Sequence, residues 1–470
     1  MSQRRNVLVL MSDEHRADVA GFAGNDVVRT PTLDWLAGTG TVFDSAYTPS
    51  PICVPARQCV LAGQYPKTCG CEGWFGLADG HMTYARRFGQ YGYQTAAFGK
   101  LHLQGPDQLE GWQSRPVGDV SCGHVEGLRE SFFDGFQAPQ DDPLNNPGSM
   151  KWSDEKELRR AGPGRYIDRK DELTILGAED WIDDNFVGTW YDRHIPRRPK
   201  MMYVGLHNPH YPYQCDEKLF RYYLPRVRGF AVESPLDHPF LGKSAWPQVP
   251  TEAGKDVPAR AVQRARAAYY GKVETMDAHF GRVLEALRFA GENLDDWIIV
   301  YCSDHGDQLG EHGLWEKQKF YEGSVRVPLI IRAPGLLPQG ARVGANVSLC
   351  DLFATLCDLA DIETPPELDS RSLVPPATGE RDDWPDEACS FFLQQGYTNV
   401  MIKRGSLKYQ WYEHEQQGVM PEVLFDLAKD PCESVNVIDD RDYADQVRQF
   451  RARLSELGYG PEKAAKPGND

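Results

Sequence analysis

The chain has 470 residues, of which 41% are hydrophobic and 25% charged, and its formal net charge is −17. This composition is that of an ordinary globular protein and excludes disordered and fibrous classes. The negative charge disfavours nonspecific binding to nucleic acid or to an anionic membrane, because the average field repels polyanions. No apolar run approaches the roughly 20 residues that span a bilayer. We therefore expect a protein with no nucleic-acid partner and no membrane contact.

The cysteines indicate a cellular compartment. There are eleven, an odd number scattered over a long chain, and no signal-peptide pattern precedes them. A disulfide framework is therefore not expected. We expect a reducing, cytoplasmic setting. The sequence does not decide whether the protein is a monomer or a homo-oligomer.

Four short apolar runs each stop at a polar cluster. Runs of about six apolar residues are typical of strands buried on both faces, as in parallel sheets covered by helices. The runs are 6–11, 95–98, 201–206 and 297–302. The helices predicted between them cover 31–38, 83–91 and about 259–290. This alternation predicts an α/β, doubly wound domain with a mostly parallel central sheet, in which ligands bind beyond the carboxyl ends of the strands. The four polar clusters are expected to meet there.

The length exceeds what one hydrophobic core usually supports, so a second, smaller unit is expected. Residues 105–165 and 214–255 are rich in Gly, Pro and charge and are predicted to be long surface excursions. After Pro375 and Pro376 the pattern changes to alternating segments and a final helix. We predict a catalytic domain over 1–375 and a smaller C-terminal α+β subdomain, with a small antiparallel sheet and a helix, over 376–470.

Three acids follow two of the apolar runs. Asp13 and Glu14 end the first run, and Asp304 ends the fourth with His305 beside it. Carboxylate oxygens select hard divalent cations such as Ca²⁺ or Mg²⁺, and an imidazole leaves room for Mn²⁺. The alternative is that each acid only caps a following helix.

The segment P-I-C-V-P-A-R places Cys53, Pro55 and Arg57 in the spacing C-x-P-x-R. This spacing resembles the signature at which sulfatases convert cysteine to formylglycine. Further motifs match that family in order: N-V-L-V-L-M-S-D-E, T-P-T-L-D-W-L-A, G-K-L-H, N-P-H, S-D-H-G, K-Q-K-F-Y-E-G-S-V-R-V-P-L-I and L-F-D-L-A-K-D-P-C-E-S-V-N-V. The chain thus resembles the formylglycine-dependent sulfatases of the alkaline-phosphatase superfamily over nearly its whole length. The fold implied is alkaline-phosphatase-like.

The resemblance implies a metal site and a modified nucleophile. Its ligands would be Asp13, Glu14, Asp304 and His305, together with formylglycine 53, around one divalent ion, for which Ca²⁺ is expected and Mn²⁺ or Mg²⁺ are alternatives. Glu14 stands where many relatives carry Asp or Gln, and its reach is one methylene longer than that of Asp. A formylglycine-generating enzyme would convert Cys53. The hydrated aldehyde offers one hydroxyl to attack sulfur and a second that lets sulfate leave.

The resemblance also assigns the remaining catalytic groups. Arg57 would stabilise the nucleophile beside the metal, and Lys100 and Lys317 would hold the sulfate oxygens. His102, two residues from Lys100 and so on the same face of an extended segment, would take the diol proton. His210 would protonate the leaving alkoxide.

Each of these residues has a structural alternative, because lysines usually lie in solvent and most histidines are structural. Lys319 and His207 are neighbours that could be confused with Lys317 and His210. The family spacing favours Lys317, four residues before Tyr321, and the histidine directly after Pro209.

Other functions stay open. The same site could serve a phosphonate monoester or phosphodiester, and a non-catalytic anion-binding relative would keep only the fold. Residues 99–112 resemble choline sulfatases, which favours a small organic sulfate ester as substrate. Trp74, Phe75 and Trp112 could then face a cation, although packing at the rim is the alternative.

Overall fold

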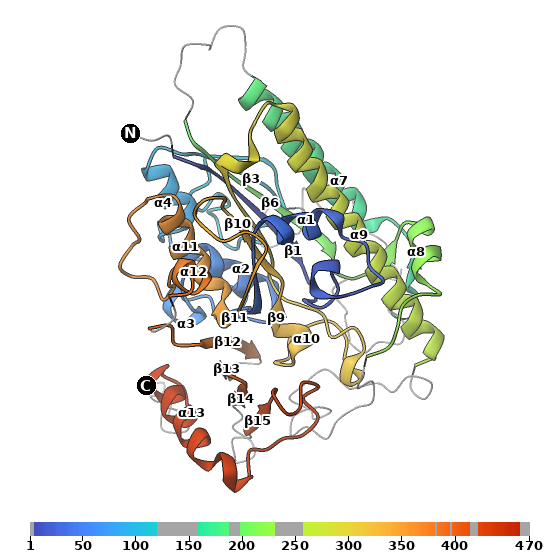
Figure 1. Cartoon of the computed structure of the whole chain (residues 1–470), viewed down its shortest axis with the longest axis vertical. Helices are drawn as coiled ribbons and strands as arrows, with labels where there is room; N and C mark the ends of the chain where they lie inside the picture. Colours follow the sequence, from blue (N-terminus) through green and yellow to red (C-terminus); the bar gives the residue numbers. More distant parts are fainter. Residues whose placement is uncertain are drawn as a thin grey trace.

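The computed structural model describes residues 4–119, 158, 160–187, 198–230, 257–380, 383–394, 397–413 and 422–460. Its central sheet has nine strands in the order β11-β2-β10-β8-β1-β6-β3-β4, with β9 beside β2 (Figure 1). The strands are β1 (Asn6–Asp13), β2 (Thr41–Tyr47), β3 (Gln94–Gly99), β4 (Ser114–Val117), β6 (Lys200–Pro209), β8 (Trp297–Ser303), β9 (Arg326–Val327), β10 (Leu329–Arg332) and β11 (Ala341–Ser348).

The four apolar runs form β1, β3, β6 and β8, which are adjacent in the order β8-β1-β6-β3 and run parallel. Val9 of β1, for example, pairs with Tyr203 on one side and Val300 on the other. Among the described strands of this sheet, the antiparallel pairs all involve β9 or β10: β10 pairs with β2 and β8, and β9 pairs with β2. The predicted fold class, α/β with a mostly parallel central sheet, is confirmed.

Helices cover both faces of the sheet, as the doubly wound prediction requires. Leu8 and Leu10 of β1 face a core built with α1, α7 and α9, whereas Val7, Val9 and Met11 face a core built with α2, α4 and α11. Alternate residues of one strand thus supply both cores, which explains why the run is continuously apolar. The helices are α1 (Pro31–Thr39), α2 (Cys53–Ala62), α3 (Pro66–Cys69), α4 (Tyr84–Gln90), α7 (Tyr166–Ile182), α8 (Glu217–Tyr223), α9 (Ala259–Phe289), α10 (Glu322–Val325), α11 (Leu352–Leu359) and α12 (Val374–Thr378).

The longest helix, α9, lies beside α7 (Figure 1). Its predicted apolar stripe, including Met276, Phe280 and Val283, is buried against the sheet. A membrane crossing would need a long helix with few charges, and the described part of the chain contains no such helix.

A second sheet follows near the C-terminus, in the order β12-β13-β14-β15, with every neighbouring pair antiparallel. Its elements are β12 (Glu387–Gln394), β13 (Tyr397–Arg404), β14 (Leu407–Trp411), β15 (Glu422–Asp426) and the helix α13 (Ala444–Glu456). One face packs on α13, and the other packs on the main domain, where Phe392, Met401 and Phe425 join a core with Phe320 and Ile52. The predicted antiparallel sheet and final helix are confirmed.

The two predicted excursions lie largely outside the described residues, which omit 120–157 and 231–256. The described parts are more regular than expected. They contain α8, β4 and a two-stranded sheet of β5 (Gly162–Pro163) and β7 (Gln214–Cys215).

Candidate metal and catalytic centre

The polar clusters predicted from the apolar runs meet at the carboxyl edge of the central sheet. Asp13 is the last residue of β1, Asp304 directly follows β8, and Lys100 directly follows β3. The backbone N–H of Glu14 donates to Asp304 Oδ1 at 3.1 Å, which joins the ends of β1 and β8. Neighbouring parallel strands end at the same edge, so the predicted convergence is confirmed.

A glycine sets the position of Lys100. Gly99 has φ 72°, and a Cβ at this position would lie 2.3 Å from the carbonyl oxygen of Gly205 and 2.5 Å from the Thr174 side chain. A residue with a side chain would both strain the backbone and push β3 away from β6. This close approach brings Lys100 to the edge where β1 and β8 end.

Cys53 is the first residue of α2. Ile52 is extended, and the helix begins at Cys53. Pro55 lies in the first turn, where its missing N–H removes no intrahelical hydrogen bond. Cys53 is 3% exposed. Its side chain therefore lies inside the protein at the helix end whose dipole favours negative charge.

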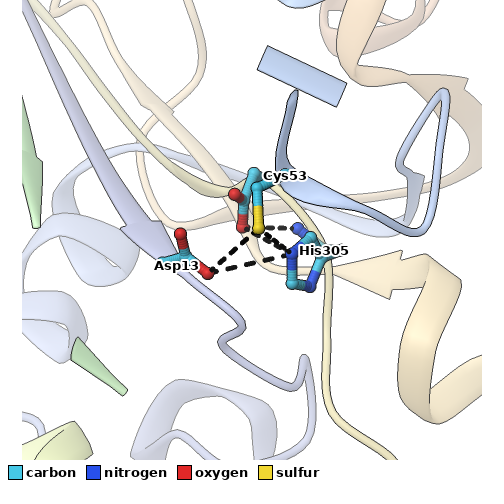
Figure 2. Close-up of side chains that lie close together, drawn as sticks. Asp13, Cys53 and His305 are labelled. Atoms are coloured by element: carbon cyan, nitrogen blue, oxygen red, sulfur yellow. Dashed lines mark hydrogen bonds and ion pairs between the residues drawn. The ribbon is translucent and has the colours of Figure 1, made fainter. Parts of the chain in front are cut away.

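Four residues form a compact buried group that we name the acid–thiol cluster: Asp13, Cys53, Asp304 and His305. One ligand atom from each lies within 4.8 Å of the others. Cys53 Sγ is 3.3 Å from His305 Nε2 and 3.9 Å from Asp13 Oδ1, as Figure 2 shows. His305 Nε2 is in turn 3.8 Å from Asp13 Oδ1 and 3.6 Å from Asp304 Oδ1. This donor set, two carboxylates and an imidazole, fits a divalent cation.

The backbone orients the imidazole of His305. Its Nδ1 lies 3.0 Å from the carbonyl oxygen of Gly306, which places the proton on Nδ1. Nε2 therefore turns a lone pair toward the cluster, as a metal-ligating histidine requires.

Two cations compensate the buried carboxylates. Arg57 donates from Nε to Asp304 Oδ2 at 2.8 Å and from Nη2 to Asp13 Oδ2 at 3.1 Å, and Lys100 also pairs with Asp13. Burial alone would raise the pKa of Asp13, but nearby cations, Lys100 first among them, hold it well below its usual value. Arg57 itself is fixed by the carbonyl oxygen of Lys100 at 2.9 Å and the hydroxyl of Tyr203 at 2.8 Å. The guanidinium is thus held in one place by bonds to residues on or directly after four strands, β1, β3, β6 and β8.

A second group, which we name the lysine cluster, consists of Glu14, His210 and Lys317. Lys317 Nζ lies 2.7 Å from Glu14 Oε2 and 2.7 Å from His210 Nε2. His210 Nδ1 donates to the carbonyl oxygen of Tyr211 at 2.7 Å, so Nε2 is free to accept. Burial raises the pKa of Glu14 to about 8 against the opposing Lys317, and Glu14 Oε1 is buried with no hydrogen-bond partner among the described residues. That oxygen therefore keeps its lone pairs uncompensated by any hydrogen-bond donor of the described residues.

His102 reaches the centre by an unexpected backbone path. The extended segment predicted for it is wrong, because His102 has φ 55°, in the left-handed region. Burial lowers the pKa of His102, and the neighbouring Cys53 opposes this shift only in part. The edge of the Trp74 ring packs on it, with 5.2 Å between ring centroids.

The structure separates each predicted residue from its rival. His207 Nδ1 lies 3.1 Å from Asp171 Oδ1, away from both clusters, whereas His210 contacts Lys317. Lys319 is buried, and burial lowers its pKa well below the usual value. For Lys317, nearby anionic groups outweigh burial and raise the pKa.

The three aromatic residues that could face a cationic substrate, Trp74, Phe75 and Trp112, differ in their exposure. Trp112 is buried and packs against Tyr84 and Tyr203, so it is a core residue. Trp74 and Phe75 are 48% and 55% exposed. Only Trp74 has a described ring contact with a candidate catalytic residue, His102.

Sequence reasoning missed two buried acids that shape the site. Asp307 Oδ1 accepts the backbone N–H groups of Leu309 and Glu316 at 2.7 and 2.9 Å, and its Oδ2 accepts the hydroxyl of Tyr213 at 2.9 Å. This ties the loop before Lys317 to the segment after His210. The other acid, Asp119, accepts the backbone N–H of His102 at 2.7 Å. Asp307 directly follows the S-D-H-G motif, so its position in the sequence could have indicated a site residue. The sequence around Asp119 contains no motif that predicts a role for it.

Comparison with known sequences gives consistent matches. The sulfatase family model matches residues 5–362, and a model of the C-terminal part of N-sulphoglucosamine sulphohydrolase matches residues 310–459. A choline-sulfatase of Rhizobium meliloti is 31% identical over 92% of this chain and 82% of that protein. An arylsulfatase of Clostridium perfringens is 28% identical over 99% of this chain and 96% of that protein.

Solved structures share the fold. A phosphonate monoester hydrolase of Agrobacterium radiobacter aligns with a TM-score of 0.75 and 24% identity, over 97% of this chain and 95% of that chain. A protein solved with its substrate D-glucosamine-2-N,6-O-disulfate aligns with a TM-score of 0.76 and 21% identity, over 97% of each chain. The fold, the site at the sheet edge and the sequence matches agree: the chain belongs to the sulfatase family and is a sulfuric ester hydrolase.

Proposed function

We propose that this sulfatase hydrolyses a small organic sulfate ester with formylglycine 53 as nucleophile, after a formylglycine-generating enzyme has converted Cys53. The observation that carries the proposal is the position of Cys53 Sγ in the acid–thiol cluster, 3.3 Å from His305 Nε2 and 3.9 Å from Asp13 Oδ1. An ordinary core cysteine has apolar neighbours, whereas this one is surrounded by ionisable groups.

A single divalent ion is proposed for the acid–thiol cluster, held by Asp13, Asp304 and His305, with Glu14 as a further ligand through its unpartnered Oε1. The oxygen-rich donor set favours Ca²⁺, with Mn²⁺ or Mg²⁺ as alternatives. The sulfur of Cys53 stands where the proposed formylglycine would carry oxygen, which is the harder ligand. When bound, the ion would supply positive charge that favours a deprotonated nucleophile and neutralises sulfate oxygens.

The chain's own cations would bind the sulfate group. Lys100 pairs with Asp13, and Lys317 pairs with Glu14. Both are buried, so their charges act in a medium of low polarity, where a preplaced cation stabilises transition-state charge most. Arg57 holds Asp13 and Asp304 and keeps the nucleophile's surroundings fixed.

Two histidines would move protons. His102 lies close enough to Cys53 for the two groups to interact electrostatically, and it would accept the proton of the hydrated side chain. His210 would protonate the leaving oxygen, because it is partly exposed and lies beside Lys317, the proposed sulfate-binding cation.

The substrate is proposed to be small, in line with the local resemblance to choline sulfatases. Trp74, beside His102, is the exposed aromatic residue nearest the proposed chemistry among the described ring contacts. We further propose a cytoplasmic setting, which is supported by ten free thiols among the cysteines of the described residues.

The test combines peptide mass analysis with turnover. Residues 51–57 of the active enzyme should carry formylglycine, and Cys53→Ser should be inactive or stop after one turnover. Cys59→Ser is the matched control, because Cys59 is a buried cysteine of the same helix outside the cluster. Sustained turnover by Cys53→Ser, or unmodified Cys53 in fully active enzyme, would remove formylglycine from the mechanism. A panel of sulfate, phosphonate and phosphodiester esters on one preparation decides the substrate class.

A further inference from the structure

Three neighbouring buried side chains have no role in the proposed mechanism. We name Asp119, His207 and Asp171 the Asp119 network. Asp119 Oδ1 lies 3.6 Å from His207 Nε2, and His207 Nδ1 lies 3.1 Å from Asp171 Oδ1. All three are at most 5% exposed.

The network joins four separate elements of the fold. Asp171 lies on α7 and also accepts the backbone N–H groups of His207 and Asn208, at 2.7 and 2.9 Å. His207 lies on β6, and Asp119 follows β4. Through Asp119 the network reaches His102, which follows β3.

The electrostatics keep both acids charged. Burial alone would raise the pKa of Asp119 and Asp171, but the bond to His207 and nearby positive charge lower both, that of Asp119 to well below its usual value. An ionised carboxylate in the interior persists only where it is paired and hydrogen-bonded, and here each acid flanks one nitrogen of the same imidazole. His207 thus lies between the two acids, hydrogen-bonded to Asp171 and within ion-pair distance of Asp119.

His102 needs such an anchor. Its left-handed backbone, φ 55°, is uncommon for a residue with a side chain. Its Nδ1 is buried with no hydrogen-bond partner among the described residues, so that nitrogen does not orient the ring. A 2.7 Å hydrogen bond from its backbone N–H to Asp119 Oδ2 holds the backbone at His102, and so sets the position from which the imidazole extends.

We propose that Asp119, held by His207 and Asp171, is the positioning residue that keeps the His102 imidazole against residue 53. The inference rests on the proposed proton-transfer role of His102. Asp119 is not among the proposed metal ligands, and its bond to the backbone N–H of His102 is the route by which it would act.

A double-mutant cycle tests this dependence. Asp119→Ala should lower kcat for nitrophenyl sulfate by roughly 10–100-fold with little change in KM, as is typical for removal of a group that orients a functional side chain. His102→Ala should cost roughly 10²–10⁴-fold. The double variant should be no slower than His102→Ala, because the anchor has nothing left to position. Losses that multiply in the double variant would overturn the proposal.

Two further variants separate positioning from general stability. Asp119→Asn keeps an oxygen that can accept the His102 N–H and should recover most of the lost kcat. Asp277→Ala is the matched control: Asp277 is also buried and accepts two backbone N–H groups, those of Thr32 and Leu33, at the start of α1. It should lower the melting temperature and leave kcat per folded molecule unchanged. If Asp119→Ala does not fold, His207→Gln takes its place in the cycle.

A readout independent of catalysis completes the test. Hydrogen exchange of the peptide containing the His102 amide should be faster in Asp119→Ala than in wild type or in Asp277→Ala. Unchanged exchange would contradict the anchoring contact itself. If the wild-type enzyme has no sulfatase activity but the exchange result is as expected, the proposed role of His102 is wrong. The hydrogen bond between Asp119 and the His102 amide would still be supported.

Discussion

The acid–thiol cluster and the lysine cluster lie side by side but are built differently. The former draws on residues at the ends of β1 and β8 and on the first residue of α2, so the register of the sheet fixes its geometry. The latter draws on loops: Glu14 has φ 67°, and Gln318, next to Lys317, has φ 71°. Its geometry depends on side-chain bonds such as those of Asp307. We infer that the register of the sheet fixes the acid–thiol cluster, whereas the lysine cluster depends on how its loops are held.

The largest effect is expected from Asp304→Ala, which breaks the sheet-built cluster. Metal binding and activity should both be lost, because the cation needs most of its anionic ligands. The variant also leaves Arg57 buried without one of its two carboxylates, so the free energy of unfolding should fall by about 3–5 kcal/mol. Metal analysis of the purified protein and a denaturant titration measure the two effects. Stoichiometric metal in this variant, or in Asp13→Ala, would count against the ligand assignment.

Lys317→Ala should rank next, since it removes the cation of the loop-built cluster. We expect roughly a 10²–10³-fold loss of kcat with metal still bound, as for removal of one preplaced charge-stabilising group. Lys319→Ala is the control, because Lys319 is equally buried but lies outside both clusters. Steady-state kinetics of the two variants decide the matter, and equal losses, or the reverse order, would refute the role of Lys317.

His210→Ala should have an effect that depends on the substrate. General-acid help matters in proportion to the basicity of the leaving oxygen, so hydrolysis of an alkyl sulfate should suffer much more than that of a nitrophenyl sulfate. The ratio of the two kcat values in variant and wild type is the measurement. A uniform loss would mean that His210 serves binding or structure instead.

Glu14→Gln should have the smallest effect and tests whether the two clusters share a residue. Glu14 pairs with Lys317 through Oε2 and has Oε1 unpartnered. If Oε1 contributes to the metal site, metal affinity should fall by roughly tenfold while activity returns at high metal concentration. Calorimetric titration of metal into the two proteins measures this. Unchanged affinity would confine Glu14 to the lysine cluster.

The central part of the fold could be predicted because burial on both faces makes a strand continuously apolar. β1, β3, β6 and β8 show this pattern. In contrast, β2 lies near the sheet edge and carries Asp44 and Ser45 in its middle, so it has no such run. The antiparallel direction of β10 depends on the long connection 304–328 after β8, whose path the sequence does not encode in any simple period.

The same contrast holds for the site. Asp13, Asp304 and Lys100 could be predicted to converge because each follows a strand of one parallel sheet. Assignment of His102, His210 and Lys317 needed the family resemblance, because their positions depend on turns. Asp119 could not be predicted at all, since its partner His102 is reached by a left-handed backbone that no local pattern indicates.

The packing of the C-terminal sheet on the main domain also has a consequence for timing. Ile52, which precedes Cys53, and Phe320, which follows Lys317, share a core with β12, β13 and β15. These strands lie C-terminal to Cys53 by more than 300 residues, so the ribosome makes them later. At roughly 5–20 residues per second, tens of seconds pass between synthesis of Cys53 and synthesis of the sheet that closes over its neighbours. If Cys53 is modified as proposed, this delay would leave a maturation enzyme time to reach it before the C-terminal sheet packs over its neighbours.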